Sequence, residues 1–362
     1  MRTERIRREQ FSAITMEDGD DEANPCEVTL EPLQALEYTP GYIYINWVAI
    51  LGHLASVIGM LIIYLPRDAF GVPYTETFLA WERSETVTIN GTNTSVCSGA
   101  TRNTANDGEF CLLSKTETLK CGDDDCALDY GWLIISFHLL SFLFQLLAAA
   151  TDYSETLRRL LCGYHYSEMI RRGKNPLRFI EYSISASIML IIIAIINGIF
   201  DIHVLFAIGV LTCSCQLCGL VVEYLDDCQL GLMWMNHLNG WLTFCSAYYI
   251  IARAFFASVN YDPDIQPPDF VYAIVIAIFL LYASFGIVQL VELTCLTCPC
   301  GDSCTTGGNG EWTRIWCPAC RTKVNGTLRC NPLYKEMVFV TLSLGAKLTL
   351  GWLLFTNVFM NT

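Results

Sequence analysis

The sequence predicts an all-α membrane protein built as a seven-transmembrane helix bundle, and three observations support this fold class. The chain of 362 residues is 53% hydrophobic and only 16% charged, and its mean hydropathy is positive. Seven stretches are long and apolar enough to cross a bilayer. Lys and Arg residues gather in particular segments between these stretches. Such a composition suits a membrane protein better than a soluble domain.

Each predicted span is a stretch of about 20 mostly apolar residues, the length that crosses the hydrocarbon core as a helix. The two halves of the chain show no repeat, which gives little support to an inverted-repeat transporter. The spans cover residues 42–64, 129–150, 176–200, 203–224, 236–257, 270–293 and 336–358. The domains are an acidic arm (1–41), the bundle (42–358) and two inserted loops (65–128 and 294–335).

Loop charges predict the orientation of the bundle, because cytosolic connections carry an excess of Lys and Arg. The arm, the connection between the second and third spans, and residues 294–335 hold clusters of them, whereas the connections after the third and fifth spans hold none. We therefore expect a plasma-membrane protein with a cytosolic N-terminus and an extracellular C-terminus. Residues 1–40 contain no signal-peptide-like apolar segment. The net charge of −14 argues against a nucleic-acid partner.

Residues 65–128 are predicted to be extracellular. Glycosylation sequons begin there at Asn90 and Asn93, whereas a third, at Asn325, falls in the predicted cytosolic loop and should stay unmodified. Four cysteines in this connection suggest two disulfides that staple a loop domain with little core, in any of three pairings. They are Cys97, Cys111, Cys121 and Cys126.

A second group of cysteines lies in the predicted cytosolic loop, residues 294–335. Two C-x-x-C pairs, Cys295/Cys298 and Cys317/Cys320, fit a four-thiolate zinc site, because a reducing cytosol keeps thiolates available. A redox-sensitive or palmitoylated cluster is the alternative. The spacing does not fix the ligand set, since Cys300 and Cys304 compete for the same role.

Lys347 is the one lysine inside any predicted span, and it lies in the middle of the seventh. An ionisable group at bilayer depth is costly and marks function by default. Snorkelling is the plain alternative, but about eleven residues, or roughly 16 Å, separate Lys347 from either end of its span. A buried lysine also forms Schiff bases readily. We therefore expect a carboxylate partner, a covalent modification, or both.

Glu181 in the third span is the expected partner of Lys347. Both spans begin on the predicted cytosolic side, and the two depths differ by roughly 9 Å, which two long side chains can bridge. The alternative is that Arg178, three residues before Glu181, already neutralises it. Ser343 and Ser185 lie one helical turn from Lys347 and Glu181, where they either hydrogen-bond the pair or simply pack as small residues.

Large side chains gather around this pair. Aromatic residues in a helix bundle usually form core, but here they also suit the apolar slot that a long polyene needs. They are Tyr182, Trp241, Phe244, Tyr248, Tyr282, Phe285 and Trp352.

Three segments of the spans resemble heliorhodopsins: NPLRFIEYSISASIML in the third, CQLCGLVVEY in the fourth and SLGAKLTLGW in the seventh. The resemblance covers all seven spans but not the acidic arm or the cysteine-rich loop. It implies a rhodopsin-like, retinal-binding bundle of inverted orientation, with a short β-hairpin in residues 65–128. It also implies a homodimer.

The resemblance further implies roles for single residues. Lys347 would hold all-trans retinal as a protonated Schiff base, and Glu181 would be its counterion, with Ser343 beside it. Arg178 would stand on the cytosolic side of Glu181. The residues that fit pocket positions are Tyr182, Tyr282, Gln289 and Trp352.

The resemblance also implies a polar cavity near the Schiff base. His53 matches one histidine of that cavity. The second is either His138 or, if the pattern SFLFQLL is aligned there, replaced by Gln145, which would alter any proton-accepting site.

The leading functional prediction is a light-sensing photoreceptor with an unknown signalling partner. A light-activated proton transporter or channel is the runner-up, although Arg253 near the outer side would oppose cation flow. A third interpretation is a retinal-free receptor or transporter in which Lys347 and Glu181 form a structural ion pair. We do not expect an enzyme, because no nucleophile–base arrangement appears near Lys347. The titratable groups behind the transport prediction are His53, His138, Glu181, Glu223 and Glu292.

Overall fold

In the part of the chain that it describes, a computed structural model shows seven helices long and apolar enough to cross a membrane, which confirms the predicted fold class. They are α2 (Gly41–Tyr64), α3 (Tyr130–Thr151), α6 (Pro176–Ile196), α7 (Ile202–Tyr224), α8 (Leu230–Tyr261), α9 (Asp269–Thr297) and α11 (Pro332–Phe359). The structure describes residues 41–66, 71–83, 85–89, 92–96, 104–105, 110–121, 123–161, 163, 165–171, 173–225, 229–261, 269–297, 322–324, 327–329 and 332–359.

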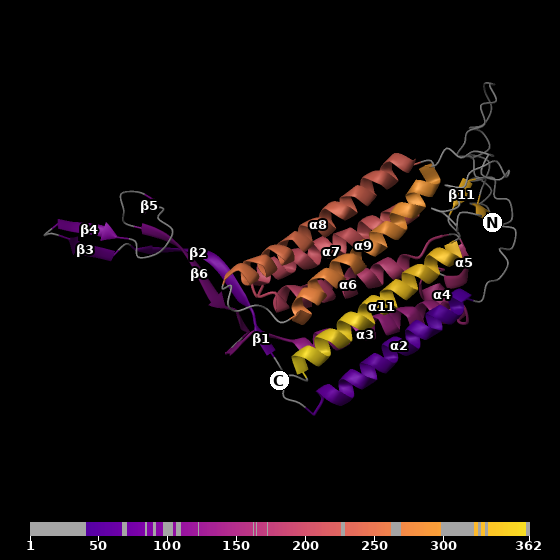
Figure 1. Cartoon of the computed structure of the whole chain (residues 1–362), viewed down its shortest axis with the longest axis horizontal. Helices are drawn as coiled ribbons and strands as arrows, with labels where there is room; N and C mark the ends of the chain where they lie inside the picture. Colours follow the sequence, from indigo (N-terminus) through magenta and orange to yellow (C-terminus); the bar gives the residue numbers. More distant parts are fainter. Residues whose placement is uncertain are drawn as a thin grey trace, which may run out of the picture.

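The seven helices run side by side along one axis (Figure 1). Many apolar side chains on their outer faces are exposed; Phe206 is 71% and Leu242 66% exposed. Contiguous apolar surface of this kind suits contact with lipid rather than with water. The chain is therefore an integral membrane protein.

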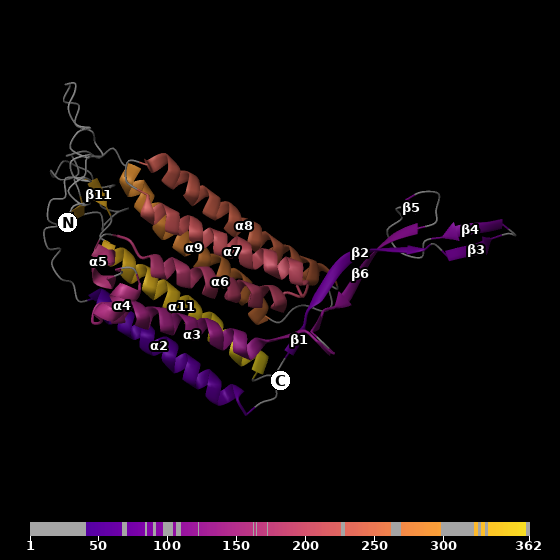
Figure 2. The same ribbon diagram turned by 180° about the vertical axis from the view of Figure 1, so that it is seen from behind.

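Short elements occupy both ends of the bundle. The described strands between α2 and α3 extend from one end, which we call the strand end (Figure 1). Helices α4 (Glu155–Leu160) and α5 (Tyr166–Arg171) and the β10–β11 hairpin (Thr322–Val324, Thr327–Arg329) lie at the other, the α5 end (Figure 2). Gly41 begins the first spanning helix at the α5 end. Because the chain crosses the bundle an odd number of times, Phe359, which ends the last one, lies at the strand end.

The strands of the inserted loop form antiparallel pairs, so the small β-containing loop is present as expected. The Cys121–Cys126 disulfide closes its last turn, whereas Cys97 lies outside the described residues. The pairs are β1 (Gly71–Pro73) with β9 (Ala127–Asp129), β2 (Thr75–Arg83) and β5 (Thr104–Ala105) with β6 (Phe110–Thr118), β3 (Glu85–Ile89) with β4 (Thr92–Val96), and β7 (Lys120–Cys121) with β8 (Asp124–Asp125).

Capping residues explain where several helices begin and end. Asn175 caps α6 by accepting a hydrogen bond from the backbone N–H of Arg178, and Pro176 follows as the first helical residue. The same helix ends at Ile196, four residues before the predicted limit, because Asn197 and Gly198 bond back to carbonyls of the last turn.

Asp201 joins the strands to the bundle. Its carboxylate caps α7 by accepting hydrogen bonds from the N–H groups of His203 (3.0 Å) and Val204 (3.2 Å), and it also accepts one from Thr77 of β2 at 2.8 Å. Partial burial would raise the pKa of Asp201, but the hydrogen bonds from Val204, Thr77 and His203 outweigh it and hold that pKa below its ordinary value.

The main core lies toward the strand end and is apolar. Its largest fully buried side chains come from α2, α3, α6, α7, α8 and α11 and leave little room for water. They include Met60, Ile134, Phe137, Ile192 and Phe355.

Candidate functional site

Lys347 of α11 lies in a buried hydrogen-bonded triad with side chains of two other helices. Its ammonium nitrogen donates to a carboxylate oxygen of Glu181 on α6 and to Ser141 Oγ on α3, the latter at 2.6 Å. Ser141 Oγ in turn donates to the same oxygen of Glu181 at 2.7 Å. Lys347 is 4% exposed and Glu181 2%. The structure thus brings the two predicted partners together and adds a third residue between them.

Arg178 does not neutralise Glu181, so that alternative was wrong. Its guanidinium, also buried, is bonded to Glu223 of α7 and Glu336 of α11. Arg178 lies three residues before Glu181 on α6 and so is nearer the α5 end of the bundle, where carboxylates of two other helices bind its guanidinium. Glu181 therefore keeps Lys347 as its cationic partner.

Arg178 belongs to an ion cluster of five buried or nearly buried charges at the α5 end, which we call the α5-end cluster. Lys335 lies 3.2 Å from Glu223 and 2.9 Å from Glu292 of α9. Asn175 donates its backbone N–H to Glu223 and its amide to Glu336, each at 2.8 Å. The cluster comprises Arg178, Glu223, Glu292, Lys335 and Glu336.

Sequence reasoning missed this cluster because the predicted seventh span began at residue 336. Helix α11 begins four residues earlier, at Pro332, a residue well suited to the first turn. Lys335 therefore lies inside a spanning helix, and Lys347 is not the one lysine within the spans.

His53 and His138 form a pair on the other side of Lys347. Their Nδ1 atoms are 3.1 Å apart, and both rings are fully buried. The Nε2 atom of each finds no hydrogen-bond partner among the described residues. Gly351, one turn beyond Lys347 along α11, makes room for them, since a Cβ there would lie 2.2 Å from His138 Nε2.

Gln145 lies apart from the histidine pair. It lines a cavity of about 340 Å³ between α2, α3, α6 and α11 that also touches Glu181, Arg178 and Glu336. The side-chain oxygen of Gln145 is buried and has no partner among the described residues. A polar cavity with an unsatisfied oxygen is the kind of place that holds ordered water.

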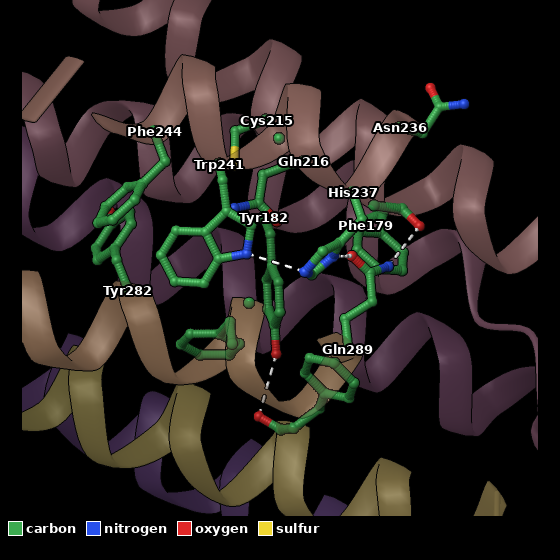
Figure 3. Close-up of a pocket in the computed structure, with 15 residues that line it drawn as sticks. Phe179, Tyr182, Cys215, Gln216, Asn236, His237, Trp241, Phe244, Tyr282 and Gln289 are labelled. Carbon is green, nitrogen blue, oxygen red and sulfur yellow. Dashed lines mark hydrogen bonds between the residues drawn. The ribbon is translucent and has the colours of Figure 1, made fainter. Parts of the chain in front are cut away.

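A larger pocket of about 600 Å³ lies between α6, α7, α8 and α9 (Figure 3). Tyr182 joins it to the lysine site, because the pocket is lined by the Tyr182 ring and the Lys347 nitrogen lies 5.0 Å from the centre of that ring. The predicted pocket residues that line it are Tyr182, Trp241, Phe244, Tyr282, Phe285 and Gln289.

Other predicted site residues lie elsewhere. Trp352 is turned toward α2, where its indole N–H donates to Ser56 Oγ at 3.1 Å, so it is not part of the large pocket. Ser343 and Ser185 are buried near the triad, and Ser185 Oγ makes no hydrogen bond to a described residue. Arg253 is exposed near the strand end of α8.

The predicted zinc and disulfide sites fall mainly outside the described part of the chain. Cys298, Cys317 and Cys320 lie there, whereas Cys295 lies in α9. Among the described residues, no cluster of three or more metal-ligating side chains appears. The zinc site, a second disulfide in the 65–128 loop, and glycans on Asn90 and Asn93 therefore stay predictions.

Besides the α5-end cluster, two residues beside the predicted site were missed in the sequence. Ser141 lies three residues after His138 and four before Gln145, so one polar face of α3 was visible but not used. His237 lines the large pocket one turn before Trp241, where an i, i+4 pair of polar aromatic side chains was the available signal.

Comparison with known proteins gives one family. Residues 100–296 match the sequence model of the family described as Heliorhodopsin, and this stretch is more than half of the chain. It runs from the strands through α9 and stops before α11, which carries Lys347. No curated protein matches the chain.

Proposed function

The chain belongs to the heliorhodopsin family of retinal-binding, light-sensing membrane proteins, and from that premise we propose that Lys347 is the attachment site of its retinal. One observation carries the proposal: the Lys347 amine is buried against Glu181 and Ser141, beside an aromatic pocket. When bound, all-trans retinal supplies light absorption and isomerisation. The lysine amine would join its aldehyde as a Schiff base with loss of water.

The residues present fit such a group. Aromatic side chains from several helices line the wall of the pocket, as the apolar slot for a long polyene requires. Glu181 and Ser141 converge on the Lys347 nitrogen, so they would hold a proton on it and balance its charge. The chain's role is therefore to bury, orient and keep charged the nitrogen that would carry the chromophore.

Reconstitution with all-trans retinal tests this assignment, and α11 offers a matched control. Lys347→Arg keeps the positive charge beside Glu181 but cannot form a Schiff base, so we expect it to abolish the visible absorption band. Lys335→Arg makes the same change in the other buried lysine of that helix, and the band should persist. A visible band in folded Lys347→Arg protein would overturn the proposal, and with it the reading of Glu181 as counterion.

Glu181→Gln tests the counterion separately. Removing the negative charge should shift the visible band or deprotonate the Schiff base near neutral pH. A band unchanged in position and in pH dependence would mean that another group balances the Lys347 charge.

We propose sensing rather than transport because of where the polar groups lie. Between Lys347 and the strand end, beyond the buried histidine pair, the core consists of Met60, Ile134, Phe355 and their apolar neighbours. The α5 side instead holds the polar cavity and the α5-end cluster. This asymmetry favours a local proton shift over passage through the bundle.

The proton transporter or channel stays the alternative, because His53 and His138 place two titratable rings near Lys347. Voltage-clamp recording under illumination separates the two functions. Photocurrents at any voltage would favour the alternative, and their absence at every voltage would leave the sensor.

Partners and placement are part of the same proposal. The cytosolic N-terminus, the plasma membrane, the homodimer and a signalling partner for the arm or the 294–335 loop rest on loop charges and on the family resemblance. Glycan mapping tests the orientation: sugar on Asn90 or Asn93 supports it, and sugar on Asn325 contradicts it.

A further inference from the structure

We infer that His237 is a positioning residue of the pocket: as its Nδ1-protonated tautomer, it bridges Trp241 to Gln289 and fixes the indole that forms one wall. Its ring lies at 3% exposure on α8, between side chains of α8 and α9 (Figure 3). The inference rests on the proposed retinal site, since it assigns a role to a wall of the same pocket.

The hydrogen bonds leave one possible neutral tautomer. The Trp241 indole N–H can only donate, and it points at His237 Nε2 at 2.9 Å, so that nitrogen carries no proton. The proton of the neutral ring therefore sits on Nδ1, which faces Gln289 Oε1 at 3.2 Å. Gln289 Nε2 then donates to the carbonyl of Gly219 at 3.1 Å. The indole N–H of Trp241, the Nδ1–H of His237 and one amide N–H of Gln289 thus each meet an acceptor.

This chain of hydrogen bonds links α8, α9 and α7 across the pocket. Trp241 and His237 belong to α8, Gln289 to α9 and Gly219 to α7. The indole also packs closely against the backbone of α9 at Gly286. A Cβ at that position would lie 2.8 Å from Trp241 Cζ2, so only a glycine leaves room for the ring. Trp241 is thus clamped between a hydrogen bond on one side and backbone contact on the other.

A histidine that merely satisfied buried polar groups would not couple to the chromophore. Here the residue it holds packs edge-on against Phe244, whose ring is stacked with Tyr282, so a rotation of Trp241 would alter the aromatic wall itself. We expect loss of the His237 bridge to change both the indole hydrogen bond and the absorption of bound retinal.

The experiment compares His237→Leu, which removes both hydrogen bonds, with His237→Gln, whose amide can still accept from Trp241 and donate to Gln289. In retinal-free protein, infrared spectroscopy follows the indole N–H stretch, assigned by its loss in Trp241→Phe. We expect that band to move in His237→Leu and to return in His237→Gln. With all-trans retinal added, the visible maximum should shift in the first variant and recover in the second.

A double variant tests the coupling. If His237 acts through Trp241, the shift in His237→Leu/Trp241→Phe should be smaller than the sum of the two single shifts. Trp234→Phe, the same change on the other side of His237, is the matched control and should leave the visible maximum unchanged. Additive shifts, or a visible maximum unmoved in His237→Leu, would overturn the inference.

The two proposals fail differently. Loss of every visible band in wild-type protein would remove the retinal site and the positioning role with it, while the infrared band would still report the bridge. A normal wild-type band with no response to His237→Leu would remove the positioning role alone.

Discussion

The half of the bundle toward the strands and the half toward α5 both bury large side chains, but with opposite chemistry. The strand-end half is filled by apolar side chains such as Ile134 and Phe355. The α5-end half buries a guanidinium, an ammonium and three carboxylates in contact with one another. Lys347, Glu181 and Ser141 lie where the two halves meet.

Because of this difference, substitutions in the two halves should lower the stability of the protein in different ways. Apolar packing loses stability in proportion to what is removed, whereas a buried ion cluster is stable only when complete. A change of charge at Glu181 should therefore affect the stability of the α5-end half more than that of the strand-end half, because Arg178 of the α5-end cluster lies one turn from Glu181 on α6.

The largest expected effect comes from breaking the α5-end cluster. Arg178→Leu leaves Glu223 and Glu336 buried without their guanidinium, which should lower the free energy of unfolding by about 3–5 kcal/mol. Thermal unfolding in detergent measures the loss. Adding Glu336→Gln should recover part of it, since one stranded charge disappears. No recovery would mean that Arg178 acts by packing rather than by charge.

The next effect comes from the apolar half. Ile192→Ala should cost about 2–4 kcal/mol, and Ile192→Val about 1 kcal/mol, because the cavity grows with the atoms removed. Ile192 is fully buried and lies roughly 21 Å along α6 from Arg178. The losses for Ile192→Ala and Arg178→Leu should therefore add. A strongly non-additive double variant would show that the halves are not independent.

A smaller effect is expected at the boundary between the halves. Gly351→Ala would push a methyl group into His138, at a cost of about 1–3 kcal/mol for overpacking. In the same protein, His138→Ala should relieve the clash, and the stability of the double variant should exceed that of Gly351→Ala. If it does not, the helix moves instead of the ring.

The smallest effect concerns the link between strands and bundle. Asp201→Ala should cost about 1 kcal/mol at neutral pH, since α7 loses its cap. The pKa of Asp201 is lower in the folded chain, so its contribution is full above the unfolded pKa near 3.8 and is lost as pH falls through the folded pKa. Unfolding followed from pH 7 to pH 2 should show the stability difference between the two proteins begin to narrow below the unfolded pKa near 3.8, and a constant difference would contradict it.

Apolar length alone predicted the seven helices, because the bilayer imposes one requirement on every span. It could not predict that α11 begins at Pro332, since Lys335 and Glu336 look like loop charges until partners from α6, α7 and α9 are in place. Likewise, Lys347 and Glu181 could be paired by depth, but Ser141 between them needed the third helix. His237 was hidden because a histidine at the edge of a span shows its role only through the partners on other helices.

Helix α11 carries both the lysine and one end of the ion cluster. Glu336 and Lys347 are eleven residues apart, which places them about 20° from each other around the helix axis and roughly 16 Å along it. A torque applied at Lys347 would therefore swing Glu336 through nearly the same arc, against Arg178, Asn175 and Tyr166. A rotation of α11 that starts at Lys347, near the middle of the membrane, would then change the contacts of Glu336 near the membrane surface.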